Sequence, residues 1–148
     1  MSDLYHAGFA LWSAQQAEAL RSAAREHSNA PLDWENLAEE IEGLGASERR
    51  ALTSHVRAMI EHLMKLRLSL AAGPRSGWKR TIRRARADIE TILETNPSLR
   101  RELSAIVGRE TIRARPLVAD DMAEHGGSSI DLDALTFDVD QVTGPWLP

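Results

Sequence analysis

A run of basic residues is the part of this sequence best suited to binding a charged ligand. Six cations and no acid fall within the twelve residues from Arg75 to Arg86. On a helix with Trp78 and Ile82 toward the core, four of these cations share the solvent-facing side. Each cation near the amino end of a helix destabilises the helix by about 0.3 to 1 kcal/mol, because the helix dipole is positive there. An anionic partner would offset this repulsion. Together with the cation that precedes them, the candidate anion-binding or partner-binding residues are Arg75, Lys79, Arg80, Arg83 and Arg84.

Other interpretations of this basic run stay open. Asp88 and Glu90 lie four residues after Arg84 and Arg86, so pairs along the helix, or acids on neighbouring helices, would neutralise the charge. A nucleic acid or a phosphate ligand is the alternative partner. However, the net charge of −4 is unlike that of a dedicated nucleic-acid binder, and no DNA-reading motif is present. We therefore expect a protein partner or a second copy of the chain.

An acidic block, Glu39, Glu40 and Glu42, is the second set of side chains that could do chemistry. Glu39 and Glu42 are neighbours at i, i+3 on a helix, and with His62 they could hold a hard cation for a metal-dependent hydrolase. The sequence lacks a Glu-x-x-His pair, and charge runs are usually solvated and paired with basic residues. We therefore expect an acidic interaction face, with no metal, no cofactor and no catalytic residue.

The composition excludes several kinds of site and location. The 148 residues contain no cysteine, which excludes disulfides, thiolate metal sites and cysteine nucleophiles. No stretch approaches the roughly 18 apolar residues of a membrane span, and no signal segment precedes Asp3-Leu4-Tyr5. We expect a cytoplasmic protein that does not bind a membrane.

The elements that must position these side chains are predicted to be helices throughout. Residues of high strand propensity are sparse and never alternate with period two, which predicts an all-α fold. Gly45 is expected to end one helix and Ser47 to begin the next, while Asn96 is expected to cap the helix that follows it. Pro116 is expected to divide the last helix. The predicted helices cover about 6–26, 33–44, 47–72, a segment through Trp78 and Ile92 that ends before Asn96, 97–115 and 116–125.

The chain changes character at Gly126, where a loop of glycine and serine is predicted. Asp133 or Asp138 is expected to start a short helical turn. The tail is expected to pack on the helices, because an exposed Trp146 would forgo about 1.5 to 3 kcal/mol of burial free energy. The sequence contains no internal repeat and no long linker. It therefore predicts one domain over residues 1–148, with a single bundle of four to five helices over 1–125 and a packed, irregular C-terminal tail over 126–148.

One block of the sequence resembles a known family. It runs Asn36-Leu37-Ala38-Glu39-Glu40-Ile41-Glu42-Gly43-Leu44-Gly45 and is followed by Ser47-Glu48-Arg49-Arg50. Further matching residues are Asp3-Leu4-Tyr5, Phe9, Trp12, Gln16-Ala17, His62-Leu63-Met64-Lys65, Trp78, Thr81-Ile82, Ile89, Leu93 and Pro97-Ser98-Leu99-Arg100. Over residues 3–107 the chain is similar to the bacterial DUF29 family. The resemblance implies an α-helical domain and no established activity.

Three hypotheses for the function follow, in order of preference. The first is a non-enzymatic interaction protein that presents an acidic and a basic helix face to a protein partner or to itself. The second is binding of a nucleic acid or a phosphate ligand through the basic helix over 75–86. The third is a metal-dependent hydrolase that uses Glu39, Glu42 and His62.

Overall fold

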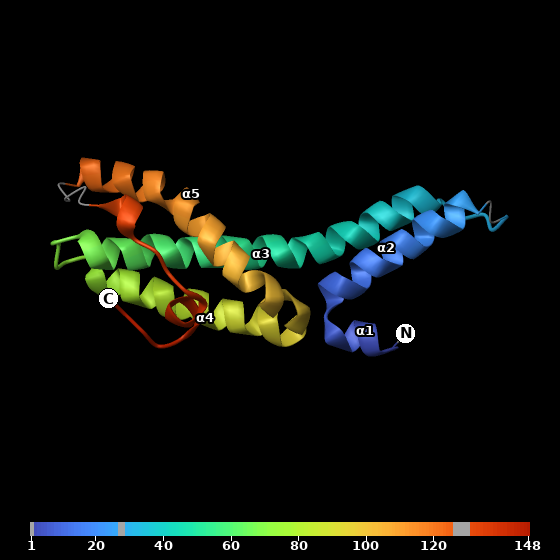
Figure 1. Cartoon of the computed structure of the whole chain (residues 1–148), viewed down its shortest axis with the longest axis horizontal. Helices are drawn as coiled ribbons and strands as arrows, with labels where there is room; N and C mark the ends of the chain where they lie inside the picture. Colours follow the sequence, from blue (N-terminus) through green and yellow to red (C-terminus); the bar gives the residue numbers. More distant parts are fainter. Residues whose placement is uncertain (1, 27–28, 126–130) are drawn as a thin grey trace. The chain divides into compact units, whose positions relative to one another are not determined.

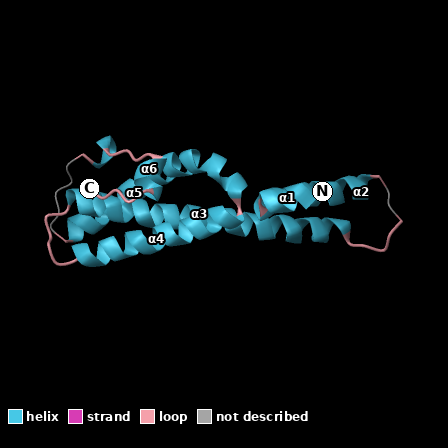
Figure 2. Ribbon diagram, turned by 90° about the horizontal axis from the view of Figure 1, so that it is seen from below, coloured by secondary structure: helices cyan, strands magenta, loops and turns pink. Residues whose placement is uncertain are grey.

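Every regular element in the computed structural model is a helix within the residues that it describes, 2–26, 29–125 and 131–148 (Figure 1, Figure 2). The predicted all-α class is confirmed, whereas the predicted loop at Gly126 lies outside the described residues. No helix in these ranges combines the length and the apolar character needed to cross a membrane. In chain order the elements are α1 Ser2–Ala7, α2 Phe9–Arg25, α3 Trp34–Leu68, α4 Arg75–Thr95, η1 Pro97–Glu102, α5 Leu103–Glu124, η2 Leu132–Ala134 and α6 Val139–Thr143.

Contacts between residues divide the chain into two compact units. Unit 1 comprises residues 1–51 and 92–100, and unit 2 comprises residues 52–91 and 101–148. Each unit is made of two separate stretches of chain, and α3, α4 and η1 each contribute residues to both units. The expected single domain over residues 1–148 stays a prediction.

In unit 1, α2 and the first part of α3 pack through small residues. The buried positions are Ala10, Ser13 and Ala17 in α2 and Ala38 and Gly45 in α3. Two larger apolar side chains of α3 lie farther out, since Leu37 is 39% exposed and Leu44 is 57% exposed. Small residues let two helix backbones approach closely, so this contact depends on the absence of large side chains between them.

Gly45 lies inside α3 rather than at a helix end, so the two helices predicted here are one. A Cβ atom added at Gly45 would collide with the Ser13 side chain and would come within 3.1 Å of the Ala10 Cα atom. The glycine is therefore explained by the close approach of α2, and not by a helix terminus.

Aromatic rings join α1 to α2. The Tyr5 ring lies 5.3 Å from the Trp12 ring in an edge-on arrangement, and the Phe9 ring stacks on Trp12 at 5.7 Å. These contacts give Trp12 a packing role between the two helices.

The break between α1 and α2 falls at Gly8, inside the single helix predicted over 6–26. Gly8 adopts a φ of +146°, which L side chains rarely adopt, and a Cβ atom there would lie 3.3 Å from the Asn96 Cα atom. Asn96 Oδ1 accepts a 3.0 Å hydrogen bond from the Ala10 N–H group, which at a helix start has no partner within the helix. The side chain of Asn96 therefore caps α2, 86 residues away, and not the helix that follows it.

The core of unit 2 comes from the later part of α3, from α4 and from α5, which lie beside one another (Figure 1). The predicted apolar stripes of these helices are buried. Leu70 is an exception and is 94% exposed, because α3 ends at Leu68. Large buried side chains of this core are Leu52, Met59, Ile60, Leu63, Met64, Ile82, Ile89 and Ile106.

α5 continues through Pro116, where two helices were predicted. Proline removes the N–H group that would bond to the carbonyl of Ile112. Both Pro116 and Ile112 are exposed, so water can hydrate the freed carbonyl and the helix need not stop. Before α5, the expected start of a helix at Pro97 is present as the tighter 3-10 helix η1.

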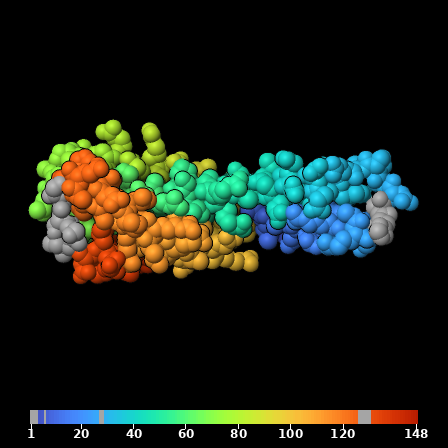
Figure 3. All heavy atoms as spheres, turned by 90° about the horizontal axis from the view of Figure 1, so that it is seen from above, coloured from blue at the N-terminus to red at the C-terminus, as the bar shows by residue number. Residues whose placement is uncertain are grey.

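The C-terminal segment packs on unit 2, as the sequence predicted from Trp146. Arg86 of α4 donates hydrogen bonds of 2.5 to 3.0 Å to three of its backbone carbonyl groups. Arg115 of α5 donates another, of 3.0 Å, to the carbonyl of Leu135. Figure 3 shows the red C-terminal residues against the orange α5. The carbonyl groups that bind Arg86 belong to Gln141, Val142 and Trp146.

Asp138 begins α6, as one of the two predicted helix starts. Its carboxylate accepts a 2.8 Å hydrogen bond from the Gln141 N–H group, and Gln141 Oε1 accepts a 3.0 Å bond from the Asp138 N–H group. This reciprocal pair is a capping box. The other predicted start, Asp133, lies within η2, which begins after Asp131.

Candidate charged binding surfaces

Four cations of α4 form one exposed surface, the basic surface: Lys79, Arg80, Arg83 and Arg84. The opposite side of the helix is buried, as the helical spacing predicted. None of the four forms an ion pair with another residue in the described part of the chain. Asp88, the expected partner of Arg84, is paired with His55, whose Nδ1 lies 3.7 Å from its Oδ2. Local acids therefore leave the basic surface without neutralisation.

The two cations that flank the basic surface have structural partners. Arg75 donates hydrogen bonds to the carbonyl groups of Leu66 at 2.9 Å and Ser69 at 3.0 Å. These carbonyls lie at the end of α3, where helical partners are missing. Arg86 is held by the C-terminal segment, and burial lowers its pKa from the ordinary value. An anion-binding role for Arg75 stays a prediction, and it would compete with these bonds.

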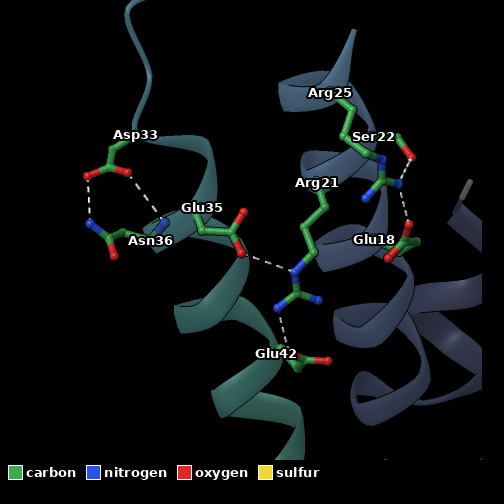
Figure 4. A network of polar contacts seen from close by, with 8 residues as sticks. All are labelled: Glu18, Arg21, Ser22, Arg25, Asp33, Glu35, Asn36 and Glu42. Atoms are coloured by element: carbon green, nitrogen blue, oxygen red, sulfur yellow. Dashed lines mark hydrogen bonds and ion pairs between the residues drawn. The ribbon is translucent and has the colours of Figure 1, made fainter. Parts of the chain in front are cut away.

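The acidic surface consists of Glu39, Glu40 and Glu42, which are all exposed on α3 in unit 1. Arg21 of α2 reaches across to α3, where it donates a 2.7 Å hydrogen bond to Glu42 Oε2 and lies 3.5 Å from Glu35 Oε1 (Figure 4). Glu39 and Glu40 form no ion pair with any described residue. Part of the acidic surface is thus bound to α2, and part is unneutralised.

The pair between Arg21 and Glu42 perturbs both groups. The hydrogen bond from Arg21 lowers the pKa of Glu42 below its ordinary value. The same hydrogen bond raises the pKa of Arg21. Both groups therefore remain charged at neutral pH, and Glu42 contributes to holding α2 against α3.

The side chains of the metal-dependent hypothesis, Glu39, Glu42 and His62, do not form a metal-binding group in the described structure. His62 Nδ1 lies 2.6 Å from the Ala58 carbonyl oxygen of its own helix. Within residues 2–26, 29–125 and 131–148, no group of three or more His, Asp or Glu side chains is placed to hold a metal ion.

A charged cluster that was not predicted surrounds Glu110 of α5. The Glu110 side chain is 0% exposed, and its Oε2 accepts a 2.7 Å hydrogen bond from Arg57 Nε of α3. Its Oε1 accepts bonds from Arg109 Nε at 3.2 Å and from Arg113 Nη1 at 3.0 Å. Burial acts to raise the pKa of Glu110, but the hydrogen bonds from Arg57 and Arg109 outweigh it, and the pKa lies below its ordinary value. Glu110 is therefore an ionised carboxylate held inside unit 2.

The sequence contains a signal for this cluster. Glu110 follows Leu103, Ile106 and Val107 at the spacing of one buried helix face. A glutamate in that register is buried only when cationic or hydrogen-bonding partners accompany it. Its neighbours Arg109 and Arg113 are such partners, whereas Arg57 is distant in sequence and carries no local signal.

These features define an all-α protein with charged helix surfaces. A family model described as "Domain of unknown function DUF29" matches residues 4–142. The chain belongs to the DUF29 family, which confirms the resemblance found over 3–107 and extends it toward the C-terminus.

A solved structure from Rhodospirillum rubrum, described as an alpha-helical protein of unknown function, is similar to this chain. The two share 26% sequence identity with a TM-score of 0.75, and the match covers 95% of this chain and 89% of that chain. No curated protein matches the chain. The family therefore rests on the family model, and the solved structure shares the helical fold.

Proposed function

We propose that this protein is a non-enzymatic interaction module that associates with a second copy of itself through its charged surfaces. The observation that supports the proposal is the presence of two exposed surfaces of opposite sign, the basic surface on α4 and the acidic surface on α3. The basic surface and the acidic residues Glu39 and Glu40 have no ion-pair partner in the described part of the chain. A second copy supplies both missing partners at once.

Symmetry doubles each favourable contact in such a dimer. In a twofold arrangement the acidic surface of each copy faces the basic surface of the other. Exposed ion pairs contribute only about 0.2 to 1 kcal/mol each, so charge sets orientation more than affinity. Apolar area is available on α3, because Leu37 and Leu44 share one side with Glu40 and are 39% and 57% exposed.

Light scattering after size exclusion tests the association directly. We expect a dimer at about 50 mM salt that dissociates toward about 500 mM, because the screening length falls severalfold over this range. A monomer at both concentrations would contradict the proposal.

A charge exchange between two variants tests which surfaces meet. E39K/E40K makes the acidic surface positive, and K79E/R80E/R83E makes the basic surface negative. Each variant alone is expected to be monomeric, because like charges then face each other across the twofold axis. An equimolar mixture is expected to dimerise, because both contacts become attractive again. Variants that each remain dimeric, or a mixture that stays monomeric, would contradict this pairing.

The exposure of the basic surface also supports a second candidate function, binding of a nucleic acid or a phosphate ligand. Fluorescence anisotropy with a short labelled oligonucleotide tests it. Affinity should fall steeply with salt concentration as counterions are released. K79E/R80E/R83E should abolish the binding, whereas E39K/E40K should preserve it. A flat salt response would remove this candidate.

A further inference from the structure

Three arginines on two helices converge on one buried carboxylate in unit 2. Arg57 of α3 and Arg109 and Arg113 of α5 each give one nitrogen to Glu110, at 2.7 to 3.2 Å. One arginine would neutralise one carboxylate, so three leave two positive charges in excess. The three arginine side chains are 38%, 47% and 55% exposed, and the excess charge is therefore accessible from solvent.

No other acid in the described part of the chain forms an ion pair with these three arginines. Glu110 is the single acid among the residues next to, or three or four positions from, Arg109 and Arg113 on α5. On α3, Glu61 lies one turn after Arg57 but forms no ion pair with it in the described structure. Arg109 and Arg113 are four residues apart on one helix, where like charges repel. The cluster therefore has a net charge that an anion would neutralise.

Each arginine retains hydrogen-bond donors for such an anion. A guanidinium group carries five N–H donors on three nitrogens. The bonds to Glu110 use Nε of Arg57, Nε of Arg109 and Nη1 of Arg113, and the described residues provide no partner for the remaining nitrogens. Anchoring by Glu110 orders these side chains in advance, which reduces the entropic cost of binding. Guanidinium groups match the geometry of phosphate oxygens and bond them in pairs.

We propose that Arg57, Arg109 and Arg113 form a binding site for a small phosphate monoester, with Glu110 as the positioning residue that orients the three guanidinium groups. The excess of two positive charges matches a phosphate monoester dianion better than the single charge of each phosphodiester in a nucleic acid. The site is separate from the basic surface on α4, so it does not depend on the proposed self-association.

Calorimetric titration with phenyl phosphate at constant ionic strength tests the site. R109Q/R113Q removes two exposed arginines while Arg57 keeps the shortest hydrogen bond to Glu110. We expect at least a tenfold loss of affinity. R67Q/R101Q is the matched control, because it removes two exposed cations of the same unit that lie outside both this cluster and the basic surface, and it should bind within twofold of the unaltered protein. If R109Q/R113Q fails to fold, R109K/R113K, which keeps the charge but loses the forked donors, should bind at least threefold more weakly.

The E110Q variant tests the positioning role of Glu110, because simple charge attraction and the loss of positioning predict opposite changes in the affinity for phenyl phosphate. E110Q removes a negative charge beneath the ligand, so attraction alone predicts tighter binding. Loss of the oriented arginines predicts binding at least threefold weaker, measured in protein that circular dichroism shows to be folded.

Four results would overturn the proposal. They are no measurable binding of phenyl phosphate by the unaltered protein at millimolar concentration, equal losses in R109Q/R113Q and R67Q/R101Q, tighter binding by folded E110Q, and an oligonucleotide that binds more tightly than phenyl phosphate and loses this affinity in R109Q/R113Q.

Discussion

Two glycines of α3, two residues apart, have opposite surroundings. A Cβ atom at Gly45 would collide with Ser13, whereas a Cβ atom at Gly43 would meet no atom within 4 Å. Glycine inside a helix costs about 0.5 to 1 kcal/mol relative to alanine. At Gly45 the close packing of α2 offsets this cost, but no contact in the described structure offsets it at Gly43.

Alanine substitutions at these two positions should therefore change stability in opposite directions. G45A is expected to lower the free energy of unfolding by about 1 to 3 kcal/mol, because the added methyl group overpacks the contact with Ala10 and Ser13. G43A is expected to raise it by about 0.5 to 1 kcal/mol through helix propensity. Urea denaturation followed by circular dichroism measures both. Changes of the same sign would show that packing against α2 is not the reason for Gly45.

At this scale the sequence revealed residue types but not their partners. Asn96 was expected to cap a helix, because its short amide side chain suits that role, but the helix predicted for it was the wrong one. The helix that it caps begins far away in sequence. Asn96 Oδ1 accepts a hydrogen bond from the N–H group of Ala10, which lies 86 residues earlier. Local patterns contain no information about such a contact. The same holds for Arg57, which reaches Glu110 from another helix.

At the scale of elements, Arg86 connects α4 to the C-terminal segment. Its guanidinium group bonds to three backbone carbonyls and to no carboxylate within the described residues. Beside it, the rings of Phe137 and Trp146 lie 6.4 Å apart. The segment has little regular structure of its own, so its placement depends on these contacts.

Replacement of Arg86 should release the C-terminal segment. In R86L the three carbonyls lose a charged donor, and each such hydrogen bond contributes about 1.5 to 3 kcal/mol. Amide exchange in α6 is expected to accelerate by at least about tenfold, which corresponds to 1.4 kcal/mol. The emission of Trp146 should shift toward the red as its ring becomes hydrated. R83L, which alters an exposed arginine of the same helix, is the control and should leave both signals unchanged. Unaltered exchange in R86L would mean that other contacts hold the segment.

Helix identity followed from periodicity, whereas helix boundaries depended on tertiary contacts. The buried side of α4 that contains Ile82 was correctly identified, because burial follows the 3.6-residue period. Gly45 and Pro116 were interpreted as boundaries, because isolated helices tolerate them poorly. The structure keeps both inside helices, one through close packing and the other through solvent exposure.

At the scale of the whole molecule, ion pairs link helices within both units. Glu42 pairs with Arg21 in unit 1, and Asp121 pairs with Lys65 in unit 2, at 2.7 and 2.5 Å. The hydrogen bond from each cation lowers the pKa of its carboxylate. Glu110 also has a lowered pKa, because its arginines outweigh the effect of burial. Carboxylates with lowered pKa values bind protons more tightly in the unfolded chain, so acid favours unfolding.

The stability of the protein should accordingly fall in acid. The contribution of Glu110 is fully present above the ordinary glutamate pKa of 4.5 and is lost as pH decreases through the lower pKa of the folded state. Unfolding midpoints measured from pH 7 to pH 3 should decrease once the pH falls below 4.5. E110Q should be destabilised at pH 7 by about 1 to 3 kcal/mol, because the arginines then bond to a neutral acceptor in place of a charged one, and it should show a shallower decline in acid. A decline of equal steepness in E110Q would exclude Glu110 as a contributor.

The class and family were correctly predicted because they rest on composition and on a contiguous motif. The division into two units could not be read from the sequence. It arises because residues 92–100 return to the N-terminal stretch 1–51, and none of the boundaries between the units coincides with a glycine-rich or proline-rich linker.

Because residues 92–100 belong to unit 1, the N-terminal stretch 1–51 must wait for them during biosynthesis. At ribosomal rates of 5 to 20 residues per second, the 86 residues from Ala10 to Asn96 take roughly 4 to 17 s to emerge. During that interval the nascent N-terminal stretch contains α1, α2 and the start of α3 but lacks the side chain that caps α2. Unit 1 therefore reaches its final hydrogen bonding only after residues 52–91, the first stretch of unit 2, have already been synthesised.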